Sequence, residues 1–103
     1  MASIQNKVIV ITGASEGIGA ALAIKLAPGN KLVLAARRLE KLQEVGQQVE
    51  AAGGQVHCVA CDVMEQAQCE NLVEESVKAF GGIDMIVNNA GVSMHAWFED
   101  ITD

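Results

Sequence analysis

The sequence contains no tyrosine, and its basic side chains are few, because seven lysines and arginines stand against thirteen aspartates and glutamates. The missing tyrosine excludes a phenol as proton donor within these 103 residues. The formal net charge of −6 at pH 7 argues against nucleic acid or an anionic membrane surface as a general partner. No apolar stretch approaches the ~20 residues of a membrane span, and residues 1–7 lack the apolar core of a secretory signal. We therefore expect a cytoplasmic protein.

Cysteine is scarce as well, and two of the three cysteines form the spacing Cys-Val-Ala-Cys at Cys58 and Cys61. Such a spacing invites a redox or zinc interpretation. Residues 56–61 have the pattern of a strand, however, in which side chains alternate between faces, so the two thiols are expected on opposite sides and roughly 10 Å apart. Neither a disulfide nor a shared metal ion accepts that geometry. We expect Cys58, Cys61 and Cys69 to be buried structural thiols, without a metal.

The pattern of apolar residues predicts one α/β domain. Half of the 103 residues are hydrophobic, which suits a globular domain of modest core. Apolar runs that fit strands alternate with segments of helical periodicity. The expected strands are Lys7–Thr12, Lys31–Ala36, Val56–Cys61 and Met85–Asn89, and the expected helices are Gly17–Ala27, Leu39–Ala52 and Glu65–Phe80. Strands that are apolar throughout favour a parallel sheet with helices on both faces, and right-handed crossovers then predict a Rossmann-type doubly wound sheet, incomplete, with strand order 3-2-1-4.

A glycine-rich loop, Thr-Gly-Ala-Ser-Glu-Gly-Ile-Gly, joins the first strand to the first helix at residues 12–19. A helix that begins directly after a strand presents unpaired backbone N–H groups and the positive end of its dipole, which together bind phosphate. Gly13 suits a tight turn, Gly17 lets a pyrophosphate approach the backbone, and Gly19 lets the helix pack against the strand. The Ser15 hydroxyl either reaches a phosphate or bonds its own backbone, and the residues leave both alternatives open.

The spacing Gly-x-x-x-Gly-x-Gly after Thr12, together with Asn88-Asn89-Ala90-Gly91 at the end of the fourth strand, resembles the short-chain dehydrogenase/reductase family. The resemblance covers essentially the whole chain, but only the cofactor-binding first part of that family's domain. It implies that residues 1–103 are the dinucleotide-binding part of a domain that is truncated before its catalytic Ser and Tyr-x-x-x-Lys, which we expect beyond Asp103. We therefore name no catalytic residue here. Residues 91–103 look most like members related to the 11β-hydroxysteroid dehydrogenases.

Arg37 and Arg38 follow the second strand, where NAD-binding proteins of this fold offer an acidic residue to the ribose hydroxyls. Because this position is occupied by Ala36, no carboxylate repels a 2′-phosphate there, and an arginine guanidinium can bind a phosphate through two parallel hydrogen bonds. The pair therefore favours NADP(H) over NAD(H), with Arg37 the stronger candidate by resemblance. The alternative is a solvated charge pair at a helix start. Glu16 stands where many NADP-dependent relatives carry Lys or Arg, so the loop itself helps the 2′-phosphate less.

The resemblance also implies contacts to the adenosine. Asp62 would accept from the adenine amino group and Val63 would pack on the ring, although Asp62 also fits the N-cap of a helix that begins around residue 64 or 65. Asn88 would tie the central strands together through Thr12. Residues 89–92 would line the ribose. His57, at the start of a strand among apolar neighbours, is expected to be structural.

The sequence and the resemblance together imply that the chain is the NADP(H)-binding part of an oxidoreductase. This enzyme would transfer hydride between nicotinamide and a small-molecule carbonyl or alcohol substrate. We expect the complete protein to be a homo-oligomer that needs no metal. The alternative is a noncatalytic NADP(H)-binding sensor or regulatory module. A Rossmann methyltransferase is disfavoured, because it has no reason to carry Asn-Asn-Ala-Gly. The candidate cofactor-binding residues are Gly13, Ser15, Gly17, Ile18, Gly19, Arg37, Arg38, Asp62, Val63, Asn89, Ala90 and Gly91.

Overall fold

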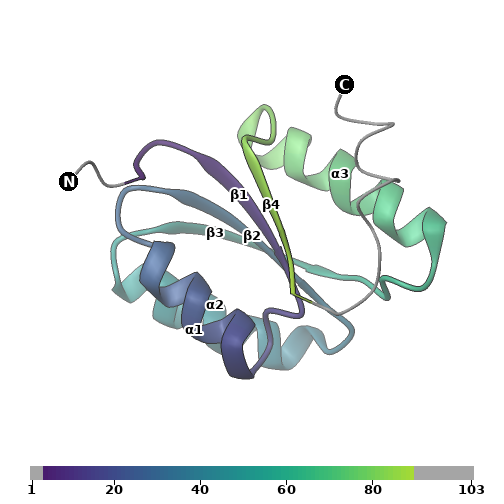
Figure 1. Cartoon of the computed structure of the whole chain (residues 1–103), viewed down its shortest axis with the longest axis horizontal. Coiled ribbons are helices and arrows are strands. Elements are labelled where there is room, and N and C mark those ends of the chain that lie inside the picture. Colours follow the sequence, from purple (N-terminus) through teal and green to yellow (C-terminus); the bar gives the residue numbers. More distant parts are fainter. Residues whose placement is uncertain (1–3, 90–103) are drawn as a thin grey trace.

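Strands and helices alternate along the whole part of the chain that the computed structural model describes, residues 4–89. The elements are β1 (Val8–Thr12), α1 (Gly17–Leu26), β2 (Lys31–Ala36), α2 (Leu39–Ala51), β3 (Gln55–Ala60), α3 (Gln66–Phe80) and β4 (Met85–Asn88). The strands form one parallel sheet in the order β3-β2-β1-β4 (Figure 1). The predicted fold class and strand order are confirmed, and every predicted boundary lies within one residue of the observed one.

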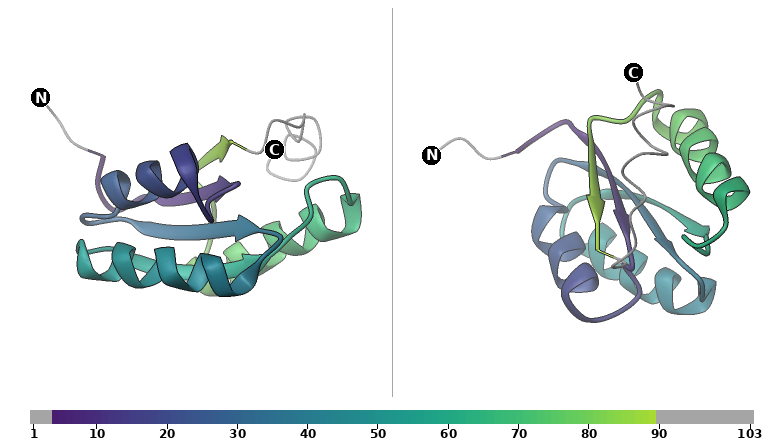
Figure 2. Two further views of the ribbon diagram at one scale, coloured as in Figure 1. Left: turned by 90° about the horizontal axis from the view of Figure 1, so that it is seen from below. Right: turned by 45° about the vertical axis from the view of Figure 1, so that its right-hand side comes forward.

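The sheet lies between two helical layers, with α1 and α2 on one face and α3 on the other (Figure 2). Successive side chains of β1 supply both faces. Ile9 and Ile11 pack with the helices α1 and α2, whereas Val10 packs with α3. Side chains in a strand point alternately to opposite faces, so a strand covered on both sides has to be apolar at every position. Among residues 4–89, no helix has both the length and the apolar character that crossing a bilayer requires.

A buried asparagine holds the N-terminal segment against the start of β2. The Asn30 side chain is only 3% exposed. Its Oδ1 accepts from the Lys7 backbone N–H at 3.0 Å, and its Nδ2 donates to the carbonyls of Ile4, at 3.0 Å, and Leu26, at 2.8 Å. One amide therefore joins the segment before β1 to the end of α1, and it satisfies three backbone groups in doing so.

We expect Asn30→Ala to destabilise the fold by about 1–3 kcal/mol, because partly buried backbone groups lose their partners. The matched control is Asn71→Ala on the exposed face of α3, which should change the free energy of unfolding by less than about 0.5 kcal/mol. Urea unfolding of the complete protein measures both values. Equal losses in the two variants would show that the Asn30 amide holds nothing in place.

Candidate nucleotide-binding site

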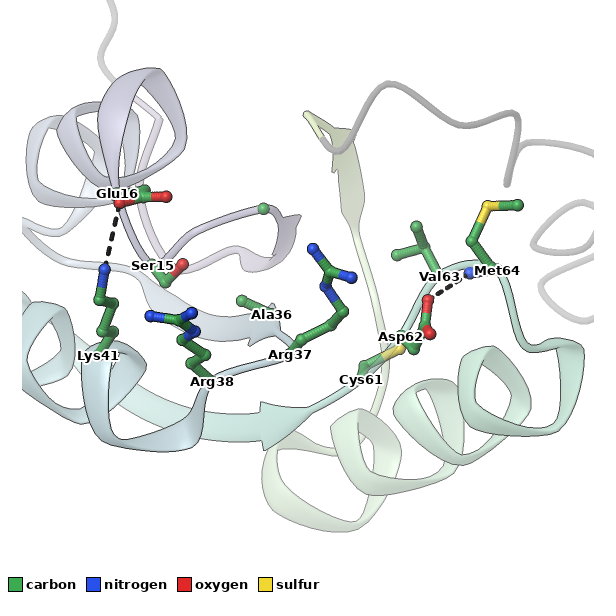
Figure 3. Close-up of a pocket in the computed structure, with 11 residues that line it drawn as sticks. Ser15, Glu16, Ala36, Arg37, Arg38, Lys41, Cys61, Asp62, Val63 and Met64 are labelled. Atoms are coloured by element: carbon green, nitrogen blue, oxygen red, sulfur yellow. Dashed lines mark hydrogen bonds and ion pairs between the residues drawn. The ribbon is translucent and has the colours of Figure 1, made fainter.

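A pocket of about 740 Å³ lies at the carboxyl ends of β1, β2 and β3 (Figure 3). Open parallel α/β sheets bind their ligands at this edge. The loops that follow the three strands, with the first turn of α2, line it through Gly13, Ser15, Glu16, Ala36, Arg37, Arg38, Lys41, Cys61, Asp62, Val63 and Met64. Three of the chain's seven basic side chains gather here although the chain carries a net charge of −6. Two acidic side chains, Glu16 and Asp62, also line the pocket, so the excess of positive charge is small but still suits an anionic ligand.

The three glycines of the loop meet different physical demands. Gly13 and Gly17 have φ values of 62° and 63°, in the left-handed region that favours glycine. A Cβ on Gly17 would meet nothing within 4 Å, so the space above its backbone is open. A Cβ on Gly19 would instead lie 2.2 Å from the Gly13 carbonyl oxygen and 2.6 Å from Asn89 Nδ2. Helix α1 can begin against the ends of β1 and β4 only because residue 19 has no side chain.

The N-cap residue of α1 does not satisfy the backbone donors at the start of that helix. Glu16 is the N-cap residue, and its side chain makes no capping hydrogen bond. The first turn contains no acidic residue either. Unpaired N–H groups and the positive end of the helix dipole therefore face the loop, which is the arrangement that favours a phosphate.

Thr12 and the two asparagines after it fasten β4 to β1 at the same edge. The Thr12 hydroxyl donates to Asn88 Oδ1 at 3.2 Å, and the Asn89 backbone N–H donates to Thr12 Oγ1 at 3.0 Å. This confirms the expected tie between Thr12 and Asn88. The Asn89 side chain donates from Nδ2 to the Gly13 carbonyl at 3.2 Å, so one of its roles is to support the glycine loop.

Asp62 does not cap helix α3. The helix begins at Gln66 with Glu65 as its N-cap residue, so the N-cap interpretation of Asp62 is wrong. Its Oδ1 instead accepts from the Met64 backbone N–H at 3.0 Å and closes a turn before the helix. This turn holds Asp62 and Val63 at the wall of the pocket (Figure 3).

The structure brings together six of the twelve candidate residues in the lining of the pocket: Gly13, Ser15, Arg37, Arg38, Asp62 and Val63. Four candidates lie outside that lining. Three of them form the start of α1, namely Gly17, Ile18 and Gly19, and the fourth, Asn89, contacts the glycine loop. Ala90 and Gly91 lie outside the described residues. Sequence reasoning missed Lys41, which reaches the pocket from α2 and whose only signal was its place in the first turn of that helix.

Comparison with known proteins agrees with this geometry. A sequence profile described as short chain dehydrogenase matches residues 7–103. The chain belongs to the short-chain dehydrogenase family. It is 48% identical over 91 residues to an uncharacterised oxidoreductase of Listeria innocua, a match that covers 87% of the chain and 37% of the relative. It is 42% identical over 102 residues to 11-beta-hydroxysteroid dehydrogenase A of Sesamum indicum, covering 97% of the chain and 29% of that protein.

Solved structures show the same relationship. L-sorbose reductase from Gluconobacter frateurii, in complex with NADPH and L-sorbose, matches with a TM-score of 0.82 and 42% identity, over 87% of this chain and 35% of that one. The chain thus spans 29% to 37% of the length of the two curated relatives named above. The likeness to the 11β-hydroxysteroid dehydrogenases that the sequence indicated is confirmed.

Cys58 and Cys61 lie on the faces of the sheet that the strand pattern predicts. Cys58 packs with the α1 and α2 layer and Cys61 with the α3 layer, which confirms that they face opposite sides of the sheet. Cys61 and Cys69 are buried, whereas Cys58 is only partly buried. Burial raises the pKa of all three thiols, that of Cys61 to about 12, with Cys69 beside it contributing. Cys61 is therefore a neutral thiol at physiological pH and adds an uncharged wall to the pocket.

His57 has a partner that its neighbours in the sequence do not reveal. Its Nε2 lies 3.2 Å from Glu75 Oε1 of helix α3. Glu75 is eighteen residues away along the chain, so the strand that contains His57 gives no sign of this carboxylate. Neither residue lines the pocket. Among residues 4–89, no three His, Cys, Asp or Glu side chains come together as metal ligands.

We expect Gly19→Ala to lower the free energy of unfolding by about 1–3 kcal/mol, because the added methyl group forces α1 away from Gly13 and Asn89. Gly82→Ala is the control, since a Cβ there would meet nothing within 4 Å and its φ is not in the left-handed region. Chemical denaturation compares the two. If Gly19→Ala unfolds like the unmodified protein, the close approach of helix to loop does not constrain this fold.

Proposed function

We propose that the pocket holds the adenosine half of NADP(H), and that the complete protein is an oxidoreductase acting on a small carbonyl or alcohol compound. NADP(H) supplies hydride-transfer chemistry when it is bound. The observation that carries the proposal is the end of β2, where Ala36 leaves no carboxylate and two arginines follow at once. Both arginines are exposed, so their guanidinium groups are available to a phosphate.

The position of these arginines fits a 2′-phosphate on the adenosine ribose. Figure 3 shows Arg37 and Arg38 between the glycine loop that carries Ser15 and the turn that carries Asp62 and Val63. A planar guanidinium binds phosphate through two parallel hydrogen bonds, and the electrostatic attraction adds to them. The NADPH bound in the L-sorbose reductase structure supports the same cofactor for this chain.

The other candidate residues would bind the remaining parts of the dinucleotide. The N–H groups at the start of α1 would bind the pyrophosphate, and the open space above Gly17 fits its close approach. Asp62 would accept a hydrogen bond from the adenine amino group, and Val63 would pack on the ring. Asn89 would hold the glycine loop in place through the hydrogen bond from its side chain to the Gly13 carbonyl. Ile18, 78% exposed in the first turn of α1, would stand beside the cofactor.

Proton transfer to the substrate oxygen would rest on a Ser and a Tyr-x-x-x-Lys outside these 103 residues, because this chain contains no tyrosine. A tyrosine needs a nearby lysine for this role, since its ordinary pKa of about 10 is far from working pH. The alternative proposal, a noncatalytic NADP(H)-binding sensor, follows if those residues do not exist after Asp103. We also propose a cytoplasmic location and a homo-oligomeric complete protein.

We expect the complete protein to bind NADPH more tightly than NADH, and Arg37→Ala to remove most of that preference. A hydrogen bond to a charged group contributes about 1.5–3 kcal/mol, so NADPH binding should weaken by roughly 10- to 150-fold. NADH binding should hardly change, and Arg38→Ala should have a smaller effect. Calorimetric titration of both cofactors decides the matter. Equal losses for NADPH and NADH would mean that Arg37 supports the fold and does not recognise the phosphate.

A chelator should leave the activity of the complete protein unchanged, because the expected proton donor is a tyrosine rather than a metal-bound water. The experiment measures carbonyl reduction with NADPH before and after treatment with EDTA and gel filtration. Activity that is lost on chelation and restored by zinc would overturn the proposed chemistry.

A further inference from the structure

An ion pair spans the pocket between the glycine loop and helix α2. Lys41 Nζ lies 3.4 Å from Glu16 Oε2, and both residues line the pocket (Figure 3). Glu16 is the last residue before α1, and Lys41 is the third residue of α2. The pair therefore connects two elements that are separated by a strand in the sequence, at the place where both helices begin.

Fold stability does not explain this pair well. The side chains are 76% exposed for Glu16 and 40% exposed for Lys41, and exposed pairs typically contribute only about 0–1 kcal/mol. Lys41 also stands in the first turn of α2, where the positive end of the helix dipole disfavours a cation. Arg38, the N-cap residue of the same helix, adds a second positive charge there. A cluster of cations at a helix N-terminus is more stable when an anion lies against it.

Glu16 provides that anion only weakly. Its carboxylate is 3.4 Å from the ammonium group, longer than the 2.7–2.9 Å of a strong charge-assisted hydrogen bond. A doubly charged phosphate between the two helix starts would attract Lys41 more strongly than a single exposed carboxylate does. Because the existing pair is weak and solvated, little free energy opposes the exchange.

We propose that Lys41 determines specificity for the 2′-phosphate of NADP(H), and that Glu16 competes with this phosphate for the Lys41 ammonium group. In the absence of nucleotide, Glu16 holds the ammonium group at the pocket. When the 2′-phosphate lies beside Arg37 and Arg38, Lys41 transfers its hydrogen bond from Glu16 to the phosphate. No covalent bond changes in this exchange. The inference rests on the proposed function, since it assumes that the pocket receives a nucleotide with a 2′-phosphate.

Binding measurements on the complete protein test this without any need for activity. The ligands are NADPH and NADH, and also adenosine 2′,5′-bisphosphate and 5′-AMP, which differ in the 2′-phosphate but carry no nicotinamide. The variants are Lys41→Gln and Glu16→Gln. Matched controls are Lys25→Gln and Glu44→Gln, which change the same side chains at exposed positions outside the pocket.

We expect Lys41→Gln to weaken NADPH and the bisphosphate by roughly 5- to 20-fold, with NADH and 5′-AMP nearly unchanged. Glu16→Gln should raise the preference for NADPH over NADH by roughly 2- to 5-fold, because the competing carboxylate is gone. The two control variants should bind all four ligands like the unmodified protein.

The outcomes separate this inference from the proposed function. If Arg37→Ala lowers the preference for NADPH while Lys41→Gln does not, the proposed function stands and the role of Lys41 is wrong. If Lys41→Gln weakens NADPH and NADH equally, Lys41 has a structural role and the inference is overturned. If Glu16→Gln leaves the preference unchanged or lowers it, Glu16 does not compete. If the unmodified protein does not prefer NADPH over NADH, both the inference and the proposed function are wrong.

Discussion

The nucleotide-binding edge depends on the contact of helix α1 with the ends of β1 and β4. At Gly19 the helix passes so close to the Gly13 carbonyl that a single Cβ would overlap it. The Asn89 side chain donates to the same carbonyl, and Thr12 fastens β4 beside it. This contact places the start of α1 beside the pocket, so the first backbone N–H groups of the helix face the glycine loop. A bulkier residue at this point would move the helix, and the phosphate-binding geometry would be lost with it.

The basic side chains that line the pocket contrast with the negative net charge of the whole chain. The chain is acidic, yet both of its arginines and one of its lysines line a single pocket. Two of these cations stand at the N-terminus of α2, which by itself disfavours them. Their position is therefore better explained by an anion that binds there than by the stability of the helix. The neutral thiol of Cys61 and the side chain of Val63 complete the pocket without adding charge.

The pattern of apolar residues was sufficient to predict the sheet, because β1 and β2 are buried on both faces and can only be central strands. The local motif was sufficient for the glycine loop, whereas the tie between Thr12 and Asn88 was implied by the family resemblance. One detail failed because it depends on where the helix begins. Asp62 has the composition of an N-cap, but α3 begins only at Gln66, so its carboxylate closes a turn instead.

By itself the sequence determined the order of the elements, the strand order and the glycine positions, because these follow from periodicity, chain connectivity and backbone sterics. Only the tertiary structure decided which charges meet. Glu16 and Lys41 are twenty-five residues apart, and their pairing exists because α1 and α2 pack side by side on one face of the sheet. His57 of β3 and Glu75 of α3 meet because α3 packs against the sheet on its other face. Side-chain contacts of this kind depend on distances in space, which no local pattern along the chain encodes.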